Sequence, residues 1–139
     1  MGYHAPDSGK EGELKLLSLA SGEKVLFLER LFLAEEKPVA LISNTIRAAG
    51  MNGAPPEDAA ALSPLDFLGR FHGRKPGDGT AYFNAVLADQ RLAGLLQVEP
   101  GSALLQMSGV MLDETGAPLM AGTELYPGDE GFQMKTQLI

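Results

Sequence analysis

The chain has 139 residues, of which 45% are apolar and 21% are charged, and its formal net charge is −7. These values are typical of one folded domain and exclude a disordered chain. The acidic charge argues against direct nucleic-acid binding, which needs clustered basic side chains, and the lack of cysteine excludes disulfide and thiol chemistry.

The N-terminal segment, residues 1–12, is polar and rich in glycine, so we predict a linker or frayed tail followed by one domain over residues 13–139. The segment lacks the hydrophobic region of a signal peptide. No apolar run in the chain approaches the roughly 20 residues of a membrane-spanning helix. A cytoplasmic protein without membrane contact is therefore expected.

Residues 24–33 and 38–46 are predicted to form a β-hairpin. The first segment is too apolar for a clean alternation, which favours a strand covered on both faces. The polar residues 35–37 form the turn, and the second segment returns as the partner strand.

Helical signals follow this hairpin. Residues 55–58 open a short helix over residues 59–62, with acids in the first turn, where the helix dipole favours them. Ser63 and Pro64 are typical of an N-cap and a first helical position, so a second helix is predicted over residues 65–71. Residues 74–79 contain several turn formers and are predicted to be a loop.

The second half of the chain repeats the pattern of strands. A strand is predicted at residues 80–87, followed by a helix that Asp89 caps and that runs through Leu96. A second hairpin has strands at residues 103–112 and 118–126, and residues 131–138 are expected to add a final strand. This order of elements predicts an α+β fold with a largely antiparallel sheet.

Two parts of the chain have similar sequences and form an internal repeat. Residues 17–25 align without a gap with residues 96–104, and further along the two hairpins Pro38 aligns with Pro118. Each copy is a short apolar segment, a glycine turn and a hairpin, and such a unit needs a neighbour to cover its apolar face. The repeat predicts a pseudo-symmetric sheet with a ligand cleft between the copies.

The chain carries no recognisable catalytic or metal-binding pattern, so no catalytic residue, metal or cofactor is expected. Of the two histidines, His4 lies in the predicted tail, and His72 is expected to place a charge at the C-terminal end of a helix dipole. Spacing typical of metal ligands is missing, and no nucleophile has an evident activating base.

Arg30 interrupts the apolar strand of the first hairpin, where an unpaired charge would be costly. Its partner is either a carboxylate such as Glu124 or an anionic ligand. Tyr82 and Tyr126 combine an apolar ring with a hydroxyl, which suits a pocket wall as well as the edge of a core. Ser63 is either a simple N-cap or part of a helix start that faces an anion.

The order and spacing of several segments resemble the UTRA domain, the effector-sensing half of bacterial transcription regulators of the GntR/HutC type. The resemblance covers roughly residues 13–138, and the segments that carry it are LERLFLA at 28–34, PVAL at 38–41, PGSALL at 100–105, GAP at 116–118 and YPGD at 126–129. It implies a chorismate lyase-like fold with a ligand between the two pseudo-repeated hairpins. It also implies a homodimer that binds DNA through a separate winged helix-turn-helix domain, which is not in this chain.

The resemblance also marks where this chain departs from the family pattern. Members that sense sugar phosphates usually carry a second arginine where this chain has Phe32, and carboxylates where it has Ile42 and Met120. Tyr126 is kept, and Ser63 stands close to a helix start that holds phosphate in the family. These losses predict a less polar effector with one anionic group for Arg30. The candidate ligand-binding residues are Arg30, Phe32, Ile42, Asn44, Ser63, Tyr82, Met120, Glu124 and Tyr126.

We therefore expect a non-enzymatic sensor of a small, anionic organic effector, whose binding shifts the population between two dimer arrangements and so alters DNA binding. A rival hypothesis from another class is an enzyme of the chorismate lyase type, which would release pyruvate from chorismate. A third is a dimerisation module without a ligand, since Phe32, Ile42 and Met120 are also suitable core residues.

Overall fold

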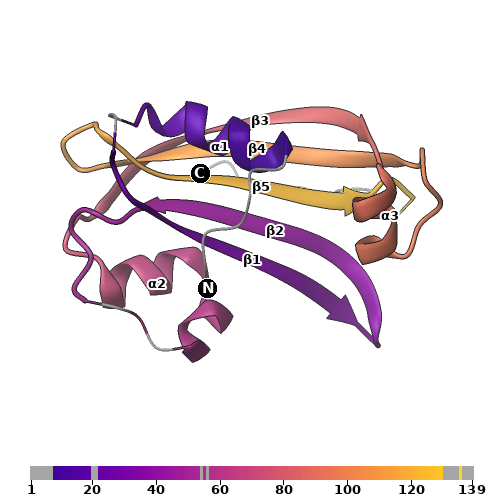
Figure 1. Cartoon of the computed structure of the whole chain (residues 1–139), viewed down its shortest axis with the longest axis horizontal. Helices are drawn as coiled ribbons and strands as arrows, with labels where there is room; N and C mark the ends of the chain where they lie inside the picture. Colours follow the sequence, from indigo (N-terminus) through magenta and orange to yellow (C-terminus); the bar gives the residue numbers. More distant parts are fainter. Residues whose placement is uncertain (1–7, 20–21, 54, 56, 130–134, 136–139) are drawn as a thin grey trace.

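The computed structural model describes residues 8–19, 22–53, 55, 57–129 and 135. These residues form one antiparallel sheet of five strands in the order β1-β2-β5-β4-β3, with helices on both sides (Figure 1). The elements along the chain are α1 (Ser8–Leu17), β1 (Val25–Ala34), β2 (Lys37–Arg47), the 3-10 helix η1 (Glu57–Ala61), α2 (Pro64–Phe71), β3 (Pro76–Leu87), α3 (Gln90–Leu96), β4 (Ala103–Asp113) and β5 (Pro118–Pro127). No helix within the described residues is long and apolar enough to cross a membrane. The predicted α+β fold with a largely antiparallel sheet is confirmed.

The two predicted hairpins are β1–β2 and β4–β5, and their second strands pair with each other at the centre of the sheet. The alignment of the two sequence copies sets Ser43 against Thr123, and these two residues are also partners in the β2–β5 register. An axis of pseudo-twofold symmetry therefore passes through this pair. The backbone repeats as well, because Ser18 and its equivalent Gln97 have positive φ angles of 52° and 54°.

Local sequence explains where α2 and α3 begin. Ser63 caps α2 by accepting a hydrogen bond from the backbone N–H of Asp66 at 3.2 Å, and Pro64 follows at a position whose N–H is not needed. Asp89 caps α3 by accepting from the N–H of Leu92 at 2.8 Å. Both predicted helix starts are confirmed.

Side chains alternate between the two faces of the sheet, and β2 illustrates this. The hydroxyl of Ser43 faces α1 and donates to Glu13 Oε2 at 2.7 Å, whereas the next residues on the other face, Asn44 and Ile46, lie toward α2. The core is divided accordingly. The cluster packed against α2 consists of Leu28, Ile46, Phe67, Leu68, Leu119 and Met120. The cluster packed against α3 consists of Leu41, Ala88, Ala93, Leu96, Leu104 and Leu125.

Helix α1 begins within the segment that we expected to be a linker. The expectation was a tail over residues 1–12, whereas α1 starts at Ser8. Serine and glycine are weak helix formers, so intrinsic propensity does not reveal this helix. Tertiary packing stabilises it, because Glu13 and Leu17 are 1% and 0% exposed. Residues 1–7 lie outside the described residues, so a linker there stays a prediction.

The expectation that β1 is covered on both faces is wrong for the second half of the strand. Leu31, Phe32 and Leu33 are 38%, 42% and 57% exposed. Strand β1 lies at one edge of the sheet, and the cluster packed against α2 includes Leu28 of this strand but none of these three residues. The apolar run therefore ends in a surface and not in a core.

The expected loop at residues 74–79 is shorter than predicted, because β3 already begins at Pro76. The pairing of β3 with β4 is irregular between Pro76 and Gly79, and a Cβ on Gly77 would lie 2.7 Å from the carbonyl oxygen of Asp113. Glycine therefore permits a close backbone approach at an irregular strand end. The expected final strand at residues 131–138 lies outside the described residues, apart from Lys135.

His72 ends α2 as predicted, but it does not act as a charge on the helix dipole. Its ring is buried, the backbone N–H of Arg74 donates to Nδ1 at 3.1 Å, and Nε2 lies 3.0 Å from the carbonyl oxygen of Arg47. Because a backbone N–H can only donate, Nδ1 carries no proton and Nε2 donates to Arg47. His72 is therefore a neutral link between the end of α2 and the end of β2.

We expect Asp113→Asn to lower the stability of the fold at neutral pH but not in strong acid. The Asp113 carboxylate accepts from the Thr115 hydroxyl at 2.6 Å, from Arg74 Nε at 2.6 Å and from the N–H of Ala117 at 3.0 Å. These hydrogen bonds, that from the Thr115 hydroxyl above all, hold the pKa of Asp113 well below its ordinary value. A lowered pKa in the folded state stabilises the fold above the unfolded pKa of about 4, and this contribution is lost as the pH falls.

Urea unfolding of the wild type and of Asp113→Asn at neutral pH and at about pH 3 measures this effect. The gap between the two unfolding midpoints should be wide at neutral pH and narrower in acid. A gap that stays constant across this range would mean that the Asp113 charge does not stabilise the fold.

Candidate functional site

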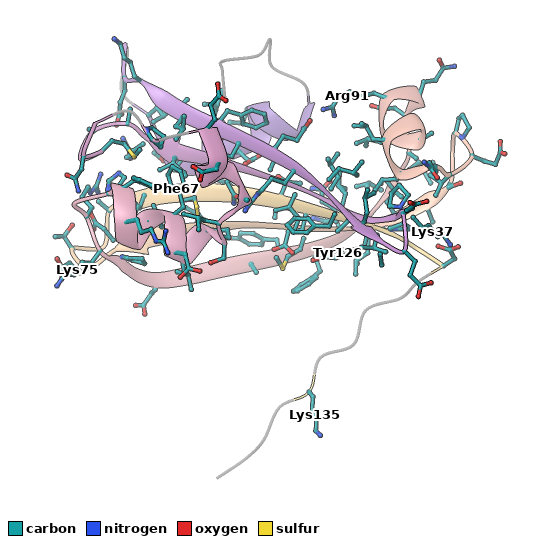
Figure 2. All side chains as sticks on the ribbon, turned by 90° about the horizontal axis from the view of Figure 1, so that it is seen from below. Lys37, Phe67, Lys75, Arg91, Tyr126 and Lys135 are labelled. Atoms are coloured by element: carbon teal, nitrogen blue, oxygen red, sulfur yellow. The ribbon has the colours of Figure 1, made fainter. Side chains whose placement is uncertain are left out.

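Eight of the nine candidate ligand-binding residues lie on the α2 side of the sheet or at the start of α2. We call this set the α2-face cluster, and it consists of Arg30, Phe32, Ile42, Asn44, Ser63, Met120, Glu124 and Tyr126. Across the strands, Arg30 is the partner of Ile42 and Ile42 is the partner of Glu124, so three strands bring these positions together. Figure 2 looks onto this side of the molecule, with Phe67 and Tyr126 at different points along the strands.

Arg30 lies at the centre of this cluster and bonds to neutral oxygen atoms. Its Nη2 donates to Asn44 Oδ1 at 2.6 Å, and its Nη1 donates to the carbonyl oxygen of Leu62, just before the N-cap of α2. The guanidinium carbon lies 5.8 Å from the centre of the Phe32 ring, within the range of a cation–π contact. Glu124, one of the two alternative partners that the sequence left open, acts on Arg30 through its charge.

The environment of Arg30 is partly desolvated. Burial lowers the pKa of Arg30 from its ordinary value, and the nearby charge of Glu124 offsets part of this effect. Within the described residues, Arg30 Nε is a buried donor atom without a hydrogen-bond acceptor. A buried unsatisfied donor is costly, and on a charged group it is more so. Arg30 therefore has one N–H that a further acceptor would satisfy.

Glu124 and Tyr126 form a pair beside Arg30. The Tyr126 hydroxyl donates to Glu124 Oε1. Burial raises the pKa of Tyr126 well above its ordinary value, and the hydrogen bond to Glu124 and its negative charge raise it further. Tyr126 is therefore a permanent donor at neutral pH, and it holds the Glu124 carboxylate in place.

A cavity of about 390 Å³ lies between α2 and the sheet. Four members of the α2-face cluster line it, namely Asn44, Ser63, Met120 and Glu124. The rest of its wall includes residues of β4 that the sequence interpretation did not include, namely Met107, Gly109, Val110 and Met111. The internal repeat was the signal for them, because it sets Arg30 against Gly109.

The sequence profile of the UTRA domain matches residues 8–130 of this chain. The chain belongs to the UTRA domain family. It is therefore an effector-sensing domain of the kind found in bacterial transcription regulators, as the sequence resemblance implied. A comparison with curated protein sequences gives no match.

Solved structures agree with this UTRA fold. A GntR-family transcriptional regulator from Enterococcus faecalis V583 is 23% identical, covers 92% of this chain and 91% of its own length, and has a TM-score of 0.78. The ligand-binding domain of a putative GntR-family regulator from Bordetella bronchiseptica is 23% identical over 90% of this chain and 79% of its own, with a TM-score of 0.75. The C-terminal domain of the histidine utilization repressor from Pseudomonas syringae is 17% identical over 90% and 86%, with a TM-score of 0.71.

Two glycines of this UTRA domain permit close approaches, Gly122 that of Asn44 in the α2-face cluster and Gly109 that of the β3 backbone. A Cβ on Gly122 would lie 2.8 Å from Asn44 Nδ2, and a Cβ on Gly109 would lie 2.7 Å from the carbonyl oxygen of Thr80. Both distances are too short for any larger residue without a shift of its neighbour. Gly122 thus permits the position in which Asn44 accepts from Arg30.

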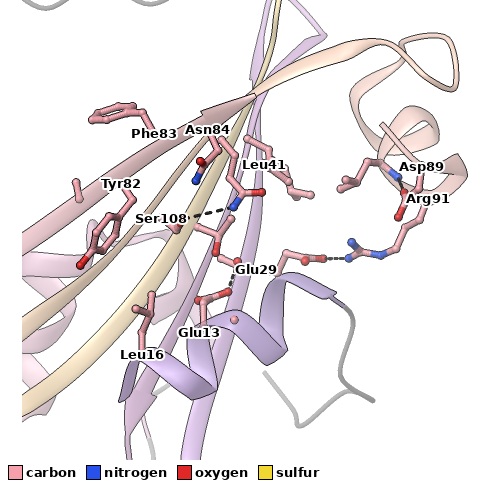
Figure 3. Close-up of a pocket in the computed structure, with 17 residues that line it drawn as sticks. Glu13, Leu16, Glu29, Leu41, Tyr82, Phe83, Asn84, Asp89, Arg91 and Ser108 are labelled. Atoms are coloured by element: carbon pink, nitrogen blue, oxygen red, sulfur yellow. Dashed lines mark hydrogen bonds and ion pairs between the residues drawn. The ribbon is translucent and has the colours of Figure 1, made fainter. Parts of the chain in front are cut away.

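Tyr82 is the candidate residue that the structure separates from the others. It is the partner of Ser108 on β4, and both side chains lie on the face of the sheet that carries α1 and α3. There Tyr82 lines a cleft of about 850 Å³ (Figure 3). The described part of this UTRA domain contains no group of three or more His, Asp or Glu side chains placed to bind a metal ion.

Proposed function

We propose that the α2-face cluster binds the effector of this UTRA domain and that Arg30 holds an anionic group of that effector. The observation that carries this proposal is the buried Nε of Arg30, which lacks an acceptor among the described residues. The guanidinium can present two N–H groups side by side to a carboxylate or phosphate. An anion would accept a hydrogen bond from Nε. It would also neutralise the positive charge of the guanidinium, whose hydrogen bonds now go to uncharged oxygen atoms.

The surroundings of Arg30 support a small and mostly apolar effector. Phe32, Ile42 and Met120 stand where sugar-phosphate-sensing members of the family usually have charged side chains, and methionines of β4 line the adjacent cavity. A volume of about 390 Å³ lies at the lower end of the range for small-molecule sites. A small organic acid fits this chemistry better than a sugar phosphate.

The bond between Arg30 and the Leu62 carbonyl supports a route from effector binding to a change of shape. Leu62 lies between η1 and the N-cap of α2, so an anion that draws Arg30 away releases the segment before α2. The effector then shifts the balance between two arrangements by binding them unequally. In this proposal, the domain works in the cytoplasm and controls the DNA affinity of a separate winged helix-turn-helix domain.

The domain acts as a homodimer in this proposal, and the edge strand β3 supplies a surface for the second copy. Three large apolar or aromatic side chains of this strand are exposed, namely Tyr82 (51%), Phe83 (47%) and Leu87 (71%). An edge strand also has backbone groups ready to pair with another chain.

Sedimentation velocity should detect a dimer of the wild type. Leu87→Lys should weaken this dimer, whereas Gln90→Lys, which makes the same charge change on α3, should leave it intact. A wild-type monomer would contradict the dimer, and a dimer unaffected by Leu87→Lys would contradict this surface.

The proposal also includes that the domain is not an enzyme. A lyase acting on chorismate would need to hold two carboxylates, and Phe32 stands where a second arginine would help. No pyruvate should form when the protein is incubated with chorismate, and its release would favour the enzymatic rival. A ligand-free dimerisation module is disfavoured by the cavity of about 390 Å³, which is lined by Asn44, the hydrogen-bond partner of Arg30.

A thermal-shift screen against small organic acids, amino-acid catabolites and sugar phosphates tests the proposed function. A ligand present at 100 times its dissociation constant should stabilise the protein by about 2.7 kcal/mol. We expect organic acids to raise the melting temperature and neutral analogues of the same acids to have no effect. A screen in which no anionic compound stabilises the protein would contradict the proposal.

A further inference from the structure

We propose that the cleft between α1 and α3 is a second binding site and that it takes a neutral ligand rich in hydroxyl groups, such as a sugar or polyol. The cleft lies on the face of the sheet opposite Arg30 and has a volume of about 850 Å³ (Figure 3). This is more than twice the volume of the cavity under α2 and lies within the range for small-molecule sites. Side chains of both helices and of all five strands line it.

The floor of the cleft combines Leu41 and Leu125 with an unusual number of polar side chains, although it lies on the central strands. Strand residues that face helices are usually apolar, and the clusters under α2 and α3 follow this rule. In the cleft, however, the floor carries Ser43 of β2, Thr123 of β5, and Gln106 and Ser108 of β4. Gln106 Nε2 donates to Ser108 Oγ at 3.3 Å, so part of the floor is already an ordered network. Ser43 uses its hydroxyl to hold α1, and the remaining polar groups of the floor suit a polar ligand.

Glu13 of α1 contributes a buried, hydrogen-bonded carboxylate to the wall. It is 1% exposed, and the Ser43 hydroxyl donates to its Oε2 at 2.7 Å, which fixes the direction of the carboxylate (Figure 3). Burying a carboxylate costs free energy that a packed helix would avoid with an apolar residue. Its presence beside the cleft is therefore further support for a polar site.

The charges around the cleft exclude an anion as its preferred ligand. Among the residues whose side chains the structure describes, Glu13, Glu29 and Asp89 line it together with one cation, Arg91. Arg91 Nη2 and Glu29 Oε1 form an ion pair at 2.5 Å, so this cation already has an anionic partner. The cleft thus differs in kind from the site around Arg30, where the central group is cationic.

The remaining groups match a molecule with many hydroxyls. The amides of Asn84 and Gln106 each offer both donors and acceptors, and each ligand hydroxyl can also donate and accept. The acids are engaged already, Glu29 by Arg91 and Asp89 by the N–H of Leu92, so neutral groups dominate recognition. The half-exposed ring of Tyr82 adds a flat apolar wall for the C–H face of a sugar ring.

The position of the cleft follows from the internal repeat. Ser43 and Thr123 mark the pseudo-twofold axis, and both line the cleft. A ligand there contacts α1 and α3, the helices that the repeat sets against each other. Ser43 and Asn44 are neighbours on β2 with side chains on opposite faces, so the two proposed sites share this strand while remaining separate.

Titrating the ¹⁵N-labelled full chain with D-glucose, sucrose and myo-inositol tests the inference by NMR. Putrescine and glucose 6-phosphate serve as cationic and anionic probes of similar size. We expect at least one of the three neutral compounds to shift the amides of Gly12, Asn84 and Ser108 in a saturable manner, without shifting those of Arg30 and Glu124. If none of the three does so, or if only putrescine or the phosphate does, the inference is wrong.

Two variants then locate the binding. Asn84→Ala and Ser108→Ala each remove one hydrogen-bonding group, and each should weaken the affinity for the neutral ligand up to about tenfold. Arg30→Ala, on the other face, should leave this affinity unchanged, and Asn84→Ala should leave the binding of an organic acid unchanged. Asn84 is exposed on an edge strand, so its replacement does not endanger folding. Equal affinity of both variants and the wild type would refute the site.

Discussion

Replacing Arg30 with alanine should weaken the binding of an anionic effector by about 2–5 kcal/mol, which corresponds to roughly 30-fold to several thousandfold in dissociation constant. Arg30 is partly buried and has one unsatisfied N–H, so a bound anion would have a strong, charge-assisted interaction with it. Isothermal titration with the best organic acid from the thermal-shift screen measures the change.

The chain offers two matched controls for this experiment. Arg70→Ala removes an arginine that is exposed at the end of α2, and it should leave the affinity unchanged. Arg30→Lys keeps the charge but loses the planar fork, so its affinity should lie between those of the wild type and Arg30→Ala. If Arg30→Ala binds the organic acid as tightly as the wild type, Arg30 does not hold the anionic group.

Replacing Phe67 with alanine should destabilise the fold by about 3–5 kcal/mol. Phe67 is 0% exposed, and its ring lies 5.2 Å from that of Phe71 between α2 and the sheet (Figure 2). Its removal leaves a cavity in the cluster that holds α2 on the strands. Urea unfolding followed by circular dichroism measures the loss as a shift of the midpoint.

Leu65→Ala is the matched control for Phe67→Ala. Leu65 lies on the same helix and is 57% exposed, so its truncation should change the stability far less than that of Phe67. Because α2 covers the cavity beside Arg30, Phe67→Ala should also reduce effector affinity in the fraction that remains folded. Similar unfolding midpoints for the two variants would mean that Phe67 does not anchor α2.

Local sequence was sufficient for much of this fold. Apolar runs separated by turn residues predicted both hairpins, and the helix starts at Ser63 and Asp89 followed from capping chemistry. The repeat predicted the pseudo-symmetry, which the pairing of Ser43 with Thr123 confirms. These features depend on residues that are close in sequence or on a pattern that occurs twice, so they can be inferred without a structure.

Contacts between side chains that are distant in sequence were harder to predict than the helices and strands. The sequence showed that Arg30 needs a partner, and the alternatives were a carboxylate such as Glu124 or an anionic ligand. Its hydrogen bonds go instead to Asn44 and to the Leu62 carbonyl, 14 and 32 residues away. A backbone carbonyl has no signature in a sequence. Tyr82 was grouped with Tyr126 by chemistry, although strand register places Tyr82 on the other face. A shift of register by one residue reverses the face of every side chain.

The sequence by itself determined the class of fold, its duplicated hairpins, its membership of the UTRA family and the position of one charged residue in an apolar strand. Only the tertiary structure decided that α1 is a helix, that the second half of β1 is exposed, and that the cavity beside Arg30 and the cleft between α1 and α3 lie on opposite faces. The physical reason is that propensity, capping and periodicity are local, whereas burial and charge pairing depend on which strand lies beside which and on which face a helix packs.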